Sequence, residues 1–471
     1  MDDGASDGQD RPEGENEVPS SRLWRTAAIG RLAATEAAKY AGTRAINLTR
    51  SPSEANEALG RRQIDAAQQI VRVLGGMKGA AMKAGQVLSV ADLEAVPEEY
   101  RDEVRATLAS LRDSAPVVPY EDMRRVIERD FGEPISRTFA EFDREPVAAA
   151  SIGQVYRARL HDGREVAVKV QYPGIDAAVR ADLQNLSPML RIAKQIIPGI
   201  DVDAVADEVR DRMHEELDYE LEADNTRAIG RIHRGHPFIV IPEVVTELCR
   251  ARVLVMDFVS GRSHEQIALL DQAERDRVAE IVFRFYFGSM YRHRAFSGDP
   301  HPGNSMLLDD GRMAFIDFGL FKRISAESAQ AELMMQRAGV EERGEELIRL
   351  MTEAGMLRDP EHSTPEGVIE QFRGYTWWFT TDEVLELDPG LATRIVLDFA
   401  DPMADQFRRV RHETLPGEHV FGRRVEMMTL AVMSQLRPSA NWYRIAREWM
   451  YGDEPVTELG RQEAAYYAAK R

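Results

Sequence analysis

The chain has 471 residues, of which 44% are hydrophobic, and its formal net charge is -19. This length suits two or three structural units with a sizeable core, and the acidic balance argues against nucleic-acid binding through overall charge. The single cysteine, Cys249, excludes an internal disulfide framework or a cysteine zinc site and fits a reducing compartment. We find neither an apolar run of transmembrane length nor a secretory signal pattern, and we therefore expect a cytoplasmic protein.

Residues 1–20 are acidic and rich in Gly and Pro, and we expect them to be disordered. The next segment, Arg22 to Arg50, mixes apolar side chains and Trp24 with six basic residues against a single acid, Glu36. A basic amphipathic helix of this kind predicts one of two things: peripheral contact with an anionic membrane, or packing on the body of its own protein. The residues alone leave both possibilities open.

A segment rich in small residues runs from Gly75 to Val87 and carries Lys83 and Gln86 as polar groups. Small side chains allow another backbone to come close, so by itself this pattern indicates a tight helix contact with solvated lysines. We assign it to a helical extension that covers residues 21–135.

Strand-like sequence begins near Phe139, and two β-rich runs follow on either side of a His161-Asp162-Gly163 turn. On the second strand Ala167 and Lys169 share a face with Val155 across the predicted hairpin. A lysine at this position can reach phosphates, while the small apolar side chains of Ala167 and Val155 cover a flat base. Taken alone, Lys169 would more often be a solvated edge lysine.

Protein kinases place a glycine-rich loop, G-x-G-x-x-G-x-V, before this strand lysine. Aligning the chain on Val155 places Ala148, Ala150 and Gly153 at the three glycine positions, so only the last glycine is kept. Alanine restricts the backbone and adds methyl groups where phosphates would pass. We therefore predict a stiffer loop with an altered nucleotide preference or geometry.

The segment from Asp201 to Ile229 is helical in pattern and strongly acidic, and we expect one of its acids to pair with Lys169, as a helix glutamate does in kinases. Two predicted strands follow, at residues 239–245 and 253–259. The second opens into Ser260-Gly261, as a hinge between two lobes requires. We assign Met256 to the base pocket and expect the backbone groups of residues 257–259 to be free to meet an adenine.

Two apolar runs, residues 305–308 and 312–316, flank Asp309-Asp310-Gly311, which is a hairpin signal. Pairing Leu308 with Arg312 puts Asn304 opposite Ile316. Asn304 and Asp317 then share the open end of one hairpin, where two oxygen ligands suit Mg²⁺ that carries substrate phosphates.

Asp299 precedes Asn304 with four residues between them, which is the spacing of the kinase catalytic loop, and Asp317-Phe318-Gly319 matches the metal-binding motif of kinases. Each motif alone is weak, because Asp-Phe-Gly is more often an ordinary turn. Their order and the connecting hairpin together indicate a kinase-type site. We interpret His301 as a loop-ordering residue and the later tryptophans as packing residues in a helical region.

With these motifs assembled, the chain resembles the UbiB/AarF/ADCK family of atypical kinases from about Arg22 to its C-terminus. The matching motifs are Lys83-Ala-Gly-Gln86 for K-x-G-Q, Ala148-Ala-Ala-Ser151 for the alanine-rich loop, Glu216-Leu-Asp218 for E-x-D, Asp299 to Asn304 for the catalytic loop and Asp317-Phe-Gly319 for the metal motif. Lys169 matches the strand lysine of the family, and Glu222 matches the glutamate that pairs with it.

The resemblance implies an α+β, two-lobed kinase-like fold with a β-rich N-lobe at 136–259, a helical C-lobe at 260–471 and the N-terminal extension. In the family the K-x-G-Q segment folds over the site and meets the E-x-D acids, which blocks protein substrates. Lys83, Gln86, Glu216 and Asp218 are therefore regulatory candidates. Family members bind ATP with Mg²⁺ and assist isoprenoid-quinone lipid biosynthesis at membranes. Membrane contact here would come from residues 22–50, at the inner face, since we find no C-terminal transmembrane segment of the kind that some members carry.

Our first hypothesis is a Mg²⁺-dependent ATPase or small-molecule kinase. Asp299 would orient the nucleophile, Asn304 and Asp317 would hold the metal, and Lys169 with Glu222 would hold the phosphates. The predicted nucleotide contacts are Ala148, Ala149, Ala150, Ser151, Gly153, Val155, Ala167, Lys169, Met256, Asp257 and Val259.

Two other hypotheses stay open at this point. One is a nucleotide-gated scaffold for a membrane biosynthetic complex, with little catalysis. The other is a Ser/Thr protein kinase, which the complete set of Asp299, Asn304 and Asp317 favours and the alanine loop and K-x-G-Q segment oppose.

Overall fold

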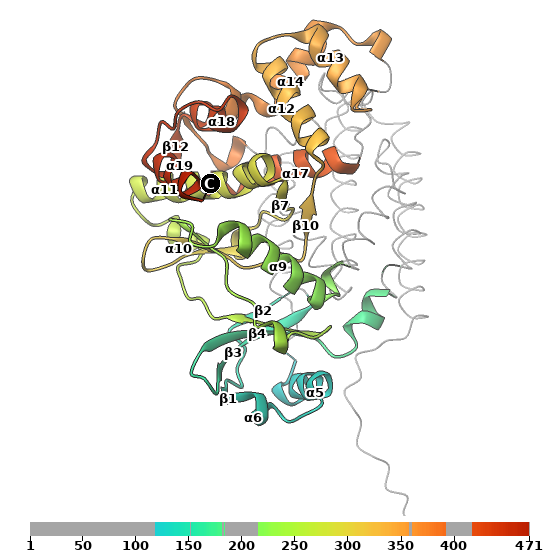
Figure 1. Cartoon of the computed structure of the whole chain (residues 1–471), viewed down its shortest axis with the longest axis vertical. Coiled ribbons are helices and arrows are strands. Elements are labelled where there is room, and N and C mark those ends of the chain that lie inside the picture. Colours follow the sequence, from blue (N-terminus) through green and yellow to red (C-terminus); the bar gives the residue numbers. More distant parts are fainter. Residues whose placement is uncertain are drawn as a thin grey trace, which may run out of the picture.

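The computed structural model describes residues 118–150, 152–180, 183, 215–357, 360–391 and 417–470. Several predictions fall outside this part of the chain: the acidic tail, the basic helix at residues 22–50, the segment that carries Lys83 and Gln86, and Ser151. The described residues form a small lobe built on a sheet and a larger, mainly helical lobe (Figure 1).

The small lobe is built on an antiparallel sheet of five strands: β1 (Phe139–Phe142), β2 (Ala148–Ala149), β3 (Gly153–Leu160), β4 (Glu165–Gln171) and β6 (Val253–Asp257). The strand order is β1-β3-β4-β6, and β2 pairs with the start of β3. Val155 lies opposite Lys169, and Gly163 adopts a φ of 92° in the turn between β3 and β4, which glycine does readily. The predicted hairpin is confirmed.

The strand period of two explains which side chains of β4 enter the core. Val166, Val168 and Val170 are fully buried on one face, so Ala167 and Lys169 lie on the other. The same core takes Met123, Val126 and Ile127 from helix α5 (Tyr120–Phe131), which is followed by the short α6 (Ile135–Thr138). We had placed α5 in the helical extension, but it packs as part of the small lobe.

Helix α9 (Tyr219–His233) contacts β6 of the small lobe and β5 (Ile239–Val240) of the large lobe, and it lies between the sheet and the helical lobe (Figure 1). It begins where it does because the side chain of Asp218 accepts hydrogen bonds from the N–H groups of Glu220 and Leu221. One face of the helix is buried and includes Glu222, while Glu220 and Asp224 are exposed. Of the acids from Glu215 to Asp224, Asp218, Glu220 and Asp224 are exposed and Glu222 alone is buried.

The predicted strand at residues 239–245 is mostly wrong. Only β5 (Ile239–Val240) forms, and it pairs in parallel with β9 (Met313–Phe315) in the large lobe. Pro242 follows it and has no N–H to continue a ladder, and a 3₁₀ turn at Thr246–Leu248 comes next. Strand β6 ends at Asp257, two residues before its predicted end, so the connection between the lobes begins at Phe258.

The large lobe holds the helices α10 (His264–Ile267), α11 (Gln272–Phe283), the π-helix η2 (Arg284–His293), η3 (Pro302–Asn304), α12 (Ala326–Val340), α13 (Gly344–Glu353), η4 (Pro360–His362), α14 (Pro365–Thr380), α17 (Gly417–Ser434), α18 (Trp442–Met450) and α19 (Glu458–Ala469). Its short strands are β7 (Ala295–Ser297), β8 (Ser305–Leu307), β9 (Met313–Phe315), β10 (Phe321–Arg323), β11 (Leu385–Glu386) and β12 (Ser439–Ala440).

Tryptophans fill much of the core of the large lobe. Trp378, Trp442 and Trp449 are buried, and Trp377 is partly buried against them, which confirms the packing role we expected. No helix among the described residues is both long and apolar enough to cross a bilayer.

Candidate active site

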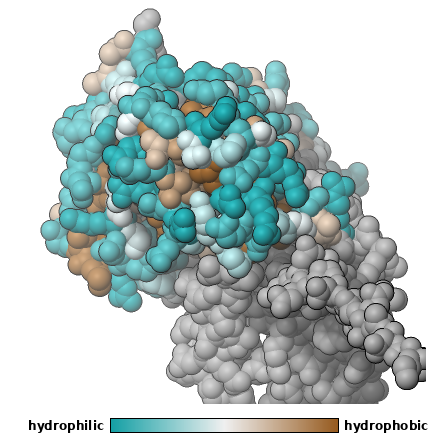
Figure 2. Space-filling view, turned by 90° about the horizontal axis from the view of Figure 1, so that it is seen from below, coloured by the Kyte–Doolittle hydropathy of each residue, from teal (hydrophilic) through white to brown (hydrophobic). Residues whose placement is uncertain are grey.

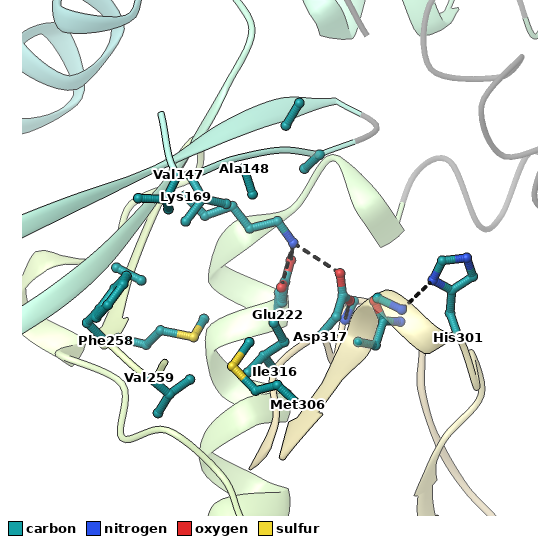
Figure 3. A pocket seen from close by; sticks show the side chains of 18 of the residues that line it. Val147, Ala148, Lys169, Glu222, Phe258, Val259, His301, Met306, Ile316 and Asp317 are labelled. Carbon is teal, nitrogen blue, oxygen red and sulfur yellow. Dashed lines mark hydrogen bonds and ion pairs between the residues drawn. The ribbon is translucent and has the colours of Figure 1, made fainter. Parts of the chain in front are cut away.

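A cavity of about 510 Å³ lies between the lobes, a size typical of sites for small molecules (Figure 3). The small-lobe sheet, the start of α9, the connection between the lobes and the β8–β9 hairpin all contribute to its lining. The predicted site residues that line it are Ala148, Ala149, Ala150, Val155, Ala167, Lys169, Glu216, Glu222, Met256, Asp257, Val259, Asp299, Asn304 and Asp317.

Lys169 and Glu222 form an ion pair at the centre of this cavity. The Nζ of Lys169 lies 2.7 Å from Oε1 and 2.9 Å from Oε2 of Glu222, and 3.4 Å from Oδ2 of Asp317 (Figure 3). The side chains of Lys169 and Glu222 are only 14% and 2% exposed. Tyr219 lies beneath the lysine, with its ring centroid 5.0 Å from Nζ. The strand lysine, the helix glutamate and the Asp of Asp-Phe-Gly therefore meet at one point.

Burial and charge act in opposite directions on this pair. Burial by itself would lower the pKa of Lys169, but the carboxylates of Asp317 and Glu222 outweigh it and hold that pKa well above its usual value. Burial raises the pKa of Glu222 to about 7, although Lys169 opposes the rise. Lys169 is therefore charged at neutral pH, and Glu222 titrates close to neutrality.

The β8–β9 hairpin positions Asn304 and Asp317 as predicted. The N–H of Leu308 donates to the carbonyl of Arg312 and that of Ile316 donates to the carbonyl of Asn304, at 2.9 and 3.0 Å. This register places Asn304 and Asp317 at the same open end of the hairpin.

The catalytic loop is ordered by its own hydrogen bonds. The Nδ2 of Asn304 donates to the carbonyl of Asp299 at 3.2 Å, which leaves Oδ1 of Asn304 as its available ligand atom. The Nδ1 of His301 accepts from the N–H of Gly303 at 3.0 Å, in agreement with its expected loop-ordering role. Asp317 Oδ1 accepts from the N–H of Gly319 at 3.1 Å.

The donor set fits Mg²⁺ bound together with phosphates. The described residues contain no group of three or more His, Cys, Asp or Glu side chains that could hold a metal by themselves. Asn304 and Asp317 line the cavity and would offer oxygen ligands, and phosphates and water would supply the others. Mg²⁺ is usually held in this way, with few protein ligands.

Apolar side chains also line the cavity. Val155 and Ala167 come from the sheet, and Met306 and Ile316 come from the hairpin (Figure 3). We missed Met306 and Ile316 at the sequence level. The alternation in β8 contains a signal for the first, since Ser305 and Leu307 are buried and Met306 between them points to the opposite face. The arrangement provides two apolar walls for a flat base.

The connection between the lobes corrects one expectation. The N–H of Asp257 donates to the carbonyl of Glu243 at 2.8 Å, and the N–H of Phe258 donates to the carbonyl of Glu165 at 3.0 Å. These two amides are therefore not free to meet an adenine. Among the described residues, no backbone hydrogen bond of this kind involves the N–H of Val259, which also lines the cavity.

Of the predicted site residues that the structure describes, two lie outside the cavity lining. A Cβ on Gly153 would lie 2.2 Å from the carbonyl oxygen of Val170, so glycine is needed there for close strand packing rather than for contact with a nucleotide. Asp218 is exposed and caps α9. Its predicted contact with Lys83, like the roles of Gln86 and Ser151, concerns residues outside the described part of the chain.

The fold and the site together define a class. The protein is a two-lobed, kinase-like α+β protein. Its β-rich lobe carries the strand lysine, a helix supplies the glutamate that pairs with it, and a hairpin carries the Asn and Asp. The family model described as "ABC1 atypical kinase-like domain" matches residues 110–344.

Among solved structures, Rv3197 of Mycobacterium tuberculosis in complex with erythromycin is 33% identical, with a TM-score of 0.60, over 84% of this chain and 98% of that chain. Among curated proteins, the atypical kinase COQ8B, mitochondrial, of Danio rerio is 30% identical over 65% of this chain and 49% of its own length. The chloroplastic ACTIVITY OF BC1 COMPLEX KINASE 8 of Arabidopsis thaliana is 32% identical over 59% of this chain and 37% of its own. The chain thus spans half or less of the length of these two curated relatives, and it belongs to the UbiB/AarF/ADCK family of atypical kinases.

Proposed function

We propose that this protein is a Mg²⁺-dependent, ATP-binding enzyme that hydrolyses ATP or transfers its γ-phosphoryl group to a small, lipid-like acceptor. The observation that carries the proposal is the contact of Lys169 with both Glu222 and Asp317 inside a cavity that Asp299 and Asn304 also line. The relatives named as atypical kinases support the same class of chemistry.

Each residue has one part in the reaction. Lys169, fixed by Glu222, holds phosphate oxygens, and Asp299 orients the attacking hydroxyl or water. Asn304 and Asp317 offer oxygen ligands for Mg²⁺, which when bound neutralises the phosphate charge that develops during transfer. Val155, Ala167, Met306 and Ile316 hold the base between them and exclude water from it. Catalysis here depends on positioning and on charge neutralisation.

The acceptor and the pathway rest on the family. We propose that the enzyme supports isoprenoid-quinone biosynthesis from a cytoplasmic position at the inner face of a membrane, with residues 22–50 as the contact. Liposome flotation with and without residues 1–50 tests that contact, and equal flotation of both proteins would reject it.

The decisive experiment is phosphate release from ATP by the purified protein with Mg²⁺, beside Asp317→Asn and Asp309→Asn. Asp309 lies in the β8–β9 turn and is absent from the cavity lining, so its variant is the matched control. We expect Asp317→Asn to lose at least about a hundredfold in turnover, the order of a lost charge-stabilising contact, and Asp309→Asn to keep it. Full turnover by Asp317→Asn would reject the proposal.

The same assay separates the other two candidates. Measurable ATP binding without turnover by the unmodified protein would favour a nucleotide-gated scaffold. Efficient phosphate transfer to purified protein substrates would favour a Ser/Thr protein kinase. Turnover that rises with anionic liposomes carrying a quinone-precursor mimic would favour a lipid acceptor.

A further inference from the structure

A second cavity, of about 300 Å³, lies beside the C-terminal half of α9 and shares no lining residue with the first cavity. Thr226, Gly230 and His233 of the helix line one part of it. The segment from Gly235 to Val244 and the side chain of Arg312, just after the β8–β9 turn, line the rest.

The lining of this cavity is strongly basic. Four arginines contribute to it and only one carboxylate, that of Glu243; the arginines are Arg227, Arg231, Arg234 and Arg312. The whole chain carries a net charge of -19, so this concentration of guanidinium groups runs against the overall balance. A cavity with such a lining attracts anions.

Two of these arginines are available to a ligand. Arg227 is held by Asp224 and by Thr246, and Arg312 is held by Asp310. Arg231 and Arg234 are both exposed, and neither forms an ion pair within the part of the chain that the structure describes. Arg231 lies in the last turn of α9 and Arg234 is the residue that follows the helix, and both line the cavity.

The carbonyl groups at the end of α9 are engaged by other side chains. The last carbonyls of a helix carry partial negative charge, but those of Ile232 and Arg234 accept hydrogen bonds from Lys470 at 3.3 Å and from Tyr466 at 2.9 Å. His233 lines the cavity and is only 4% exposed, and its Nδ1 has no hydrogen-bond partner among the described residues. A buried nitrogen without a partner, in a residue that lines the cavity, favours a polar ligand there.

We propose that this cavity binds a small phosphate-bearing group, held by Arg231 and Arg234. The planar guanidinium group presents paired donors that match phosphate oxygens better than a point charge does. A volume of about 300 Å³ is at the lower end of small-molecule sites, which suits a phosphate or diphosphate group. The group belongs either to a soluble phosphate compound or to a lipid headgroup, and both present the same chemistry.

Calorimetric titration of the full chain with pyrophosphate tests the proposal. All proteins carry Lys169→Met, which weakens any pyrophosphate binding in the first cavity. The cavity variant adds Arg231→Ala and Arg234→Ala. The control instead adds Arg125→Ala and Arg349→Ala, which remove the same charge from exposed positions outside the cavity. Circular dichroism checks that all three proteins fold alike.

We expect binding by the Lys169→Met protein, the same affinity for the control, and at least a tenfold loss for the cavity variant. Equal affinity of the cavity variant and the control would overturn the proposal, as would the absence of binding by the Lys169→Met protein.

Flotation on phosphatidylglycerol and phosphatidylcholine vesicles identifies the source of the group. The site is assigned to a lipid headgroup if the protein floats on phosphatidylglycerol vesicles, if pyrophosphate inhibits this flotation and if the cavity variant does not float. The site is assigned to a soluble phosphate compound if pyrophosphate binding depends on the two arginines while the cavity variant and the control float equally.

Figure 2 shows a mainly hydrophilic face of the molecule, with a few hydrophobic residues exposed between polar ones. The exposed large hydrophobic residues of the described chain include Leu269 and Val384.

Discussion

The Nζ of Lys322 lies 2.8 Å from Oε1 of Glu215. Lys322 is in β10, which follows Asp317-Phe318-Gly319, and Glu215 lies just before α9, the helix that carries Glu222. The pair therefore ties the segment after the proposed metal ligand to the helix that holds Lys169. Nothing in the sequence pattern singled out this contact.

Breaking this pair should affect the site more than the fold. Both side chains are partly exposed, so Glu215→Gln should change the free energy of unfolding by less than about 1 kcal/mol. We expect the Kd for ATP to rise by about three- to tenfold, because α9 loses one restraint toward Asp317. Fluorescence titration with a labelled ATP analogue measures it. An unchanged Kd in both Glu215→Gln and Lys322→Met would contradict the expectation.

The titration of Glu222 predicts a pH dependence. Its pKa is raised to about 7, so below that pH the carboxyl is protonated and holds Lys169 less firmly. Affinity for ATP should therefore rise as the pH increases through about 7. In Glu222→Gln this rise should be absent, and affinity at pH 8 should be at least about tenfold weaker. The ratio of the Kd values of the two proteins cancels the titration of ATP itself. A ratio that stays constant from pH 6 to 8 would argue against the titration of Glu222 as the cause.

The same shift also has a consequence for stability. A carboxyl group whose folded pKa lies above its ordinary value of 4.5 binds its proton more tightly in the folded state. Its contribution to the free energy of unfolding is therefore full below about pH 4.5 and is lost as the pH rises to about 7. Denaturant unfolding measures the free energy of unfolding of the unmodified protein and of Glu222→Gln across this range. Relative to Glu222→Gln, the unmodified protein should lose stability as the pH rises from about 4.5 to about 7.

Gly153 should tolerate no larger side chain. A Cβ there would lie 2.2 Å from the backbone carbonyl oxygen of Val170, which cannot move aside as a flexible side chain would. We expect Gly153→Ala to lower the free energy of unfolding by about 1–3 kcal/mol. Gly230→Ala is the matched control. Gly230 lies inside helix α9, and a Cβ there would make only an ordinary 3.7 Å contact with Ile241. This substitution should leave the stability unchanged or raise it. Equal stability of the two variants would show that the strands can separate at no cost.

Arg284 should be important for the large lobe. Its side chain is fully buried and contacts Glu280, Glu448 and Glu463, which lie on α11, α18 and α19. Replacing it by Met leaves buried carboxylates without their partner, which typically costs about 3–5 kcal/mol. Arg349→Ala removes an exposed pair with Glu353 and should change stability by less than about 0.5 kcal/mol. Urea unfolding compares the two, and a loss below about 1 kcal/mol for Arg284→Met would contradict this role.

The sequence by itself determined the local parts of the site. The β8–β9 hairpin and the β3–β4 hairpin formed in the predicted register, because a short turn with Gly at the right place fixes the register and the period of two then fixes the faces. The order of Asp299, Asn304 and Asp317 along the chain was therefore enough to place two of them at the end of one hairpin. Glu222 came from family resemblance, since the acidic helix offered several carboxylates of equal local pattern.

The tertiary structure decided whatever depends on contacts between distant segments. The partner of Lys169 lies 53 residues away along the chain, and only packing of α9 against the sheet buries Glu222 and leaves Glu220 exposed. The parallel pairing of β5 with the large lobe, the approach of Val170 to Gly153 and the basic cavity beside α9 likewise bring together segments that carry no local signal for one another. Such contacts depend on how apolar faces and charges fit across the whole fold, whereas turns and strand alternation depend on a few neighbouring residues.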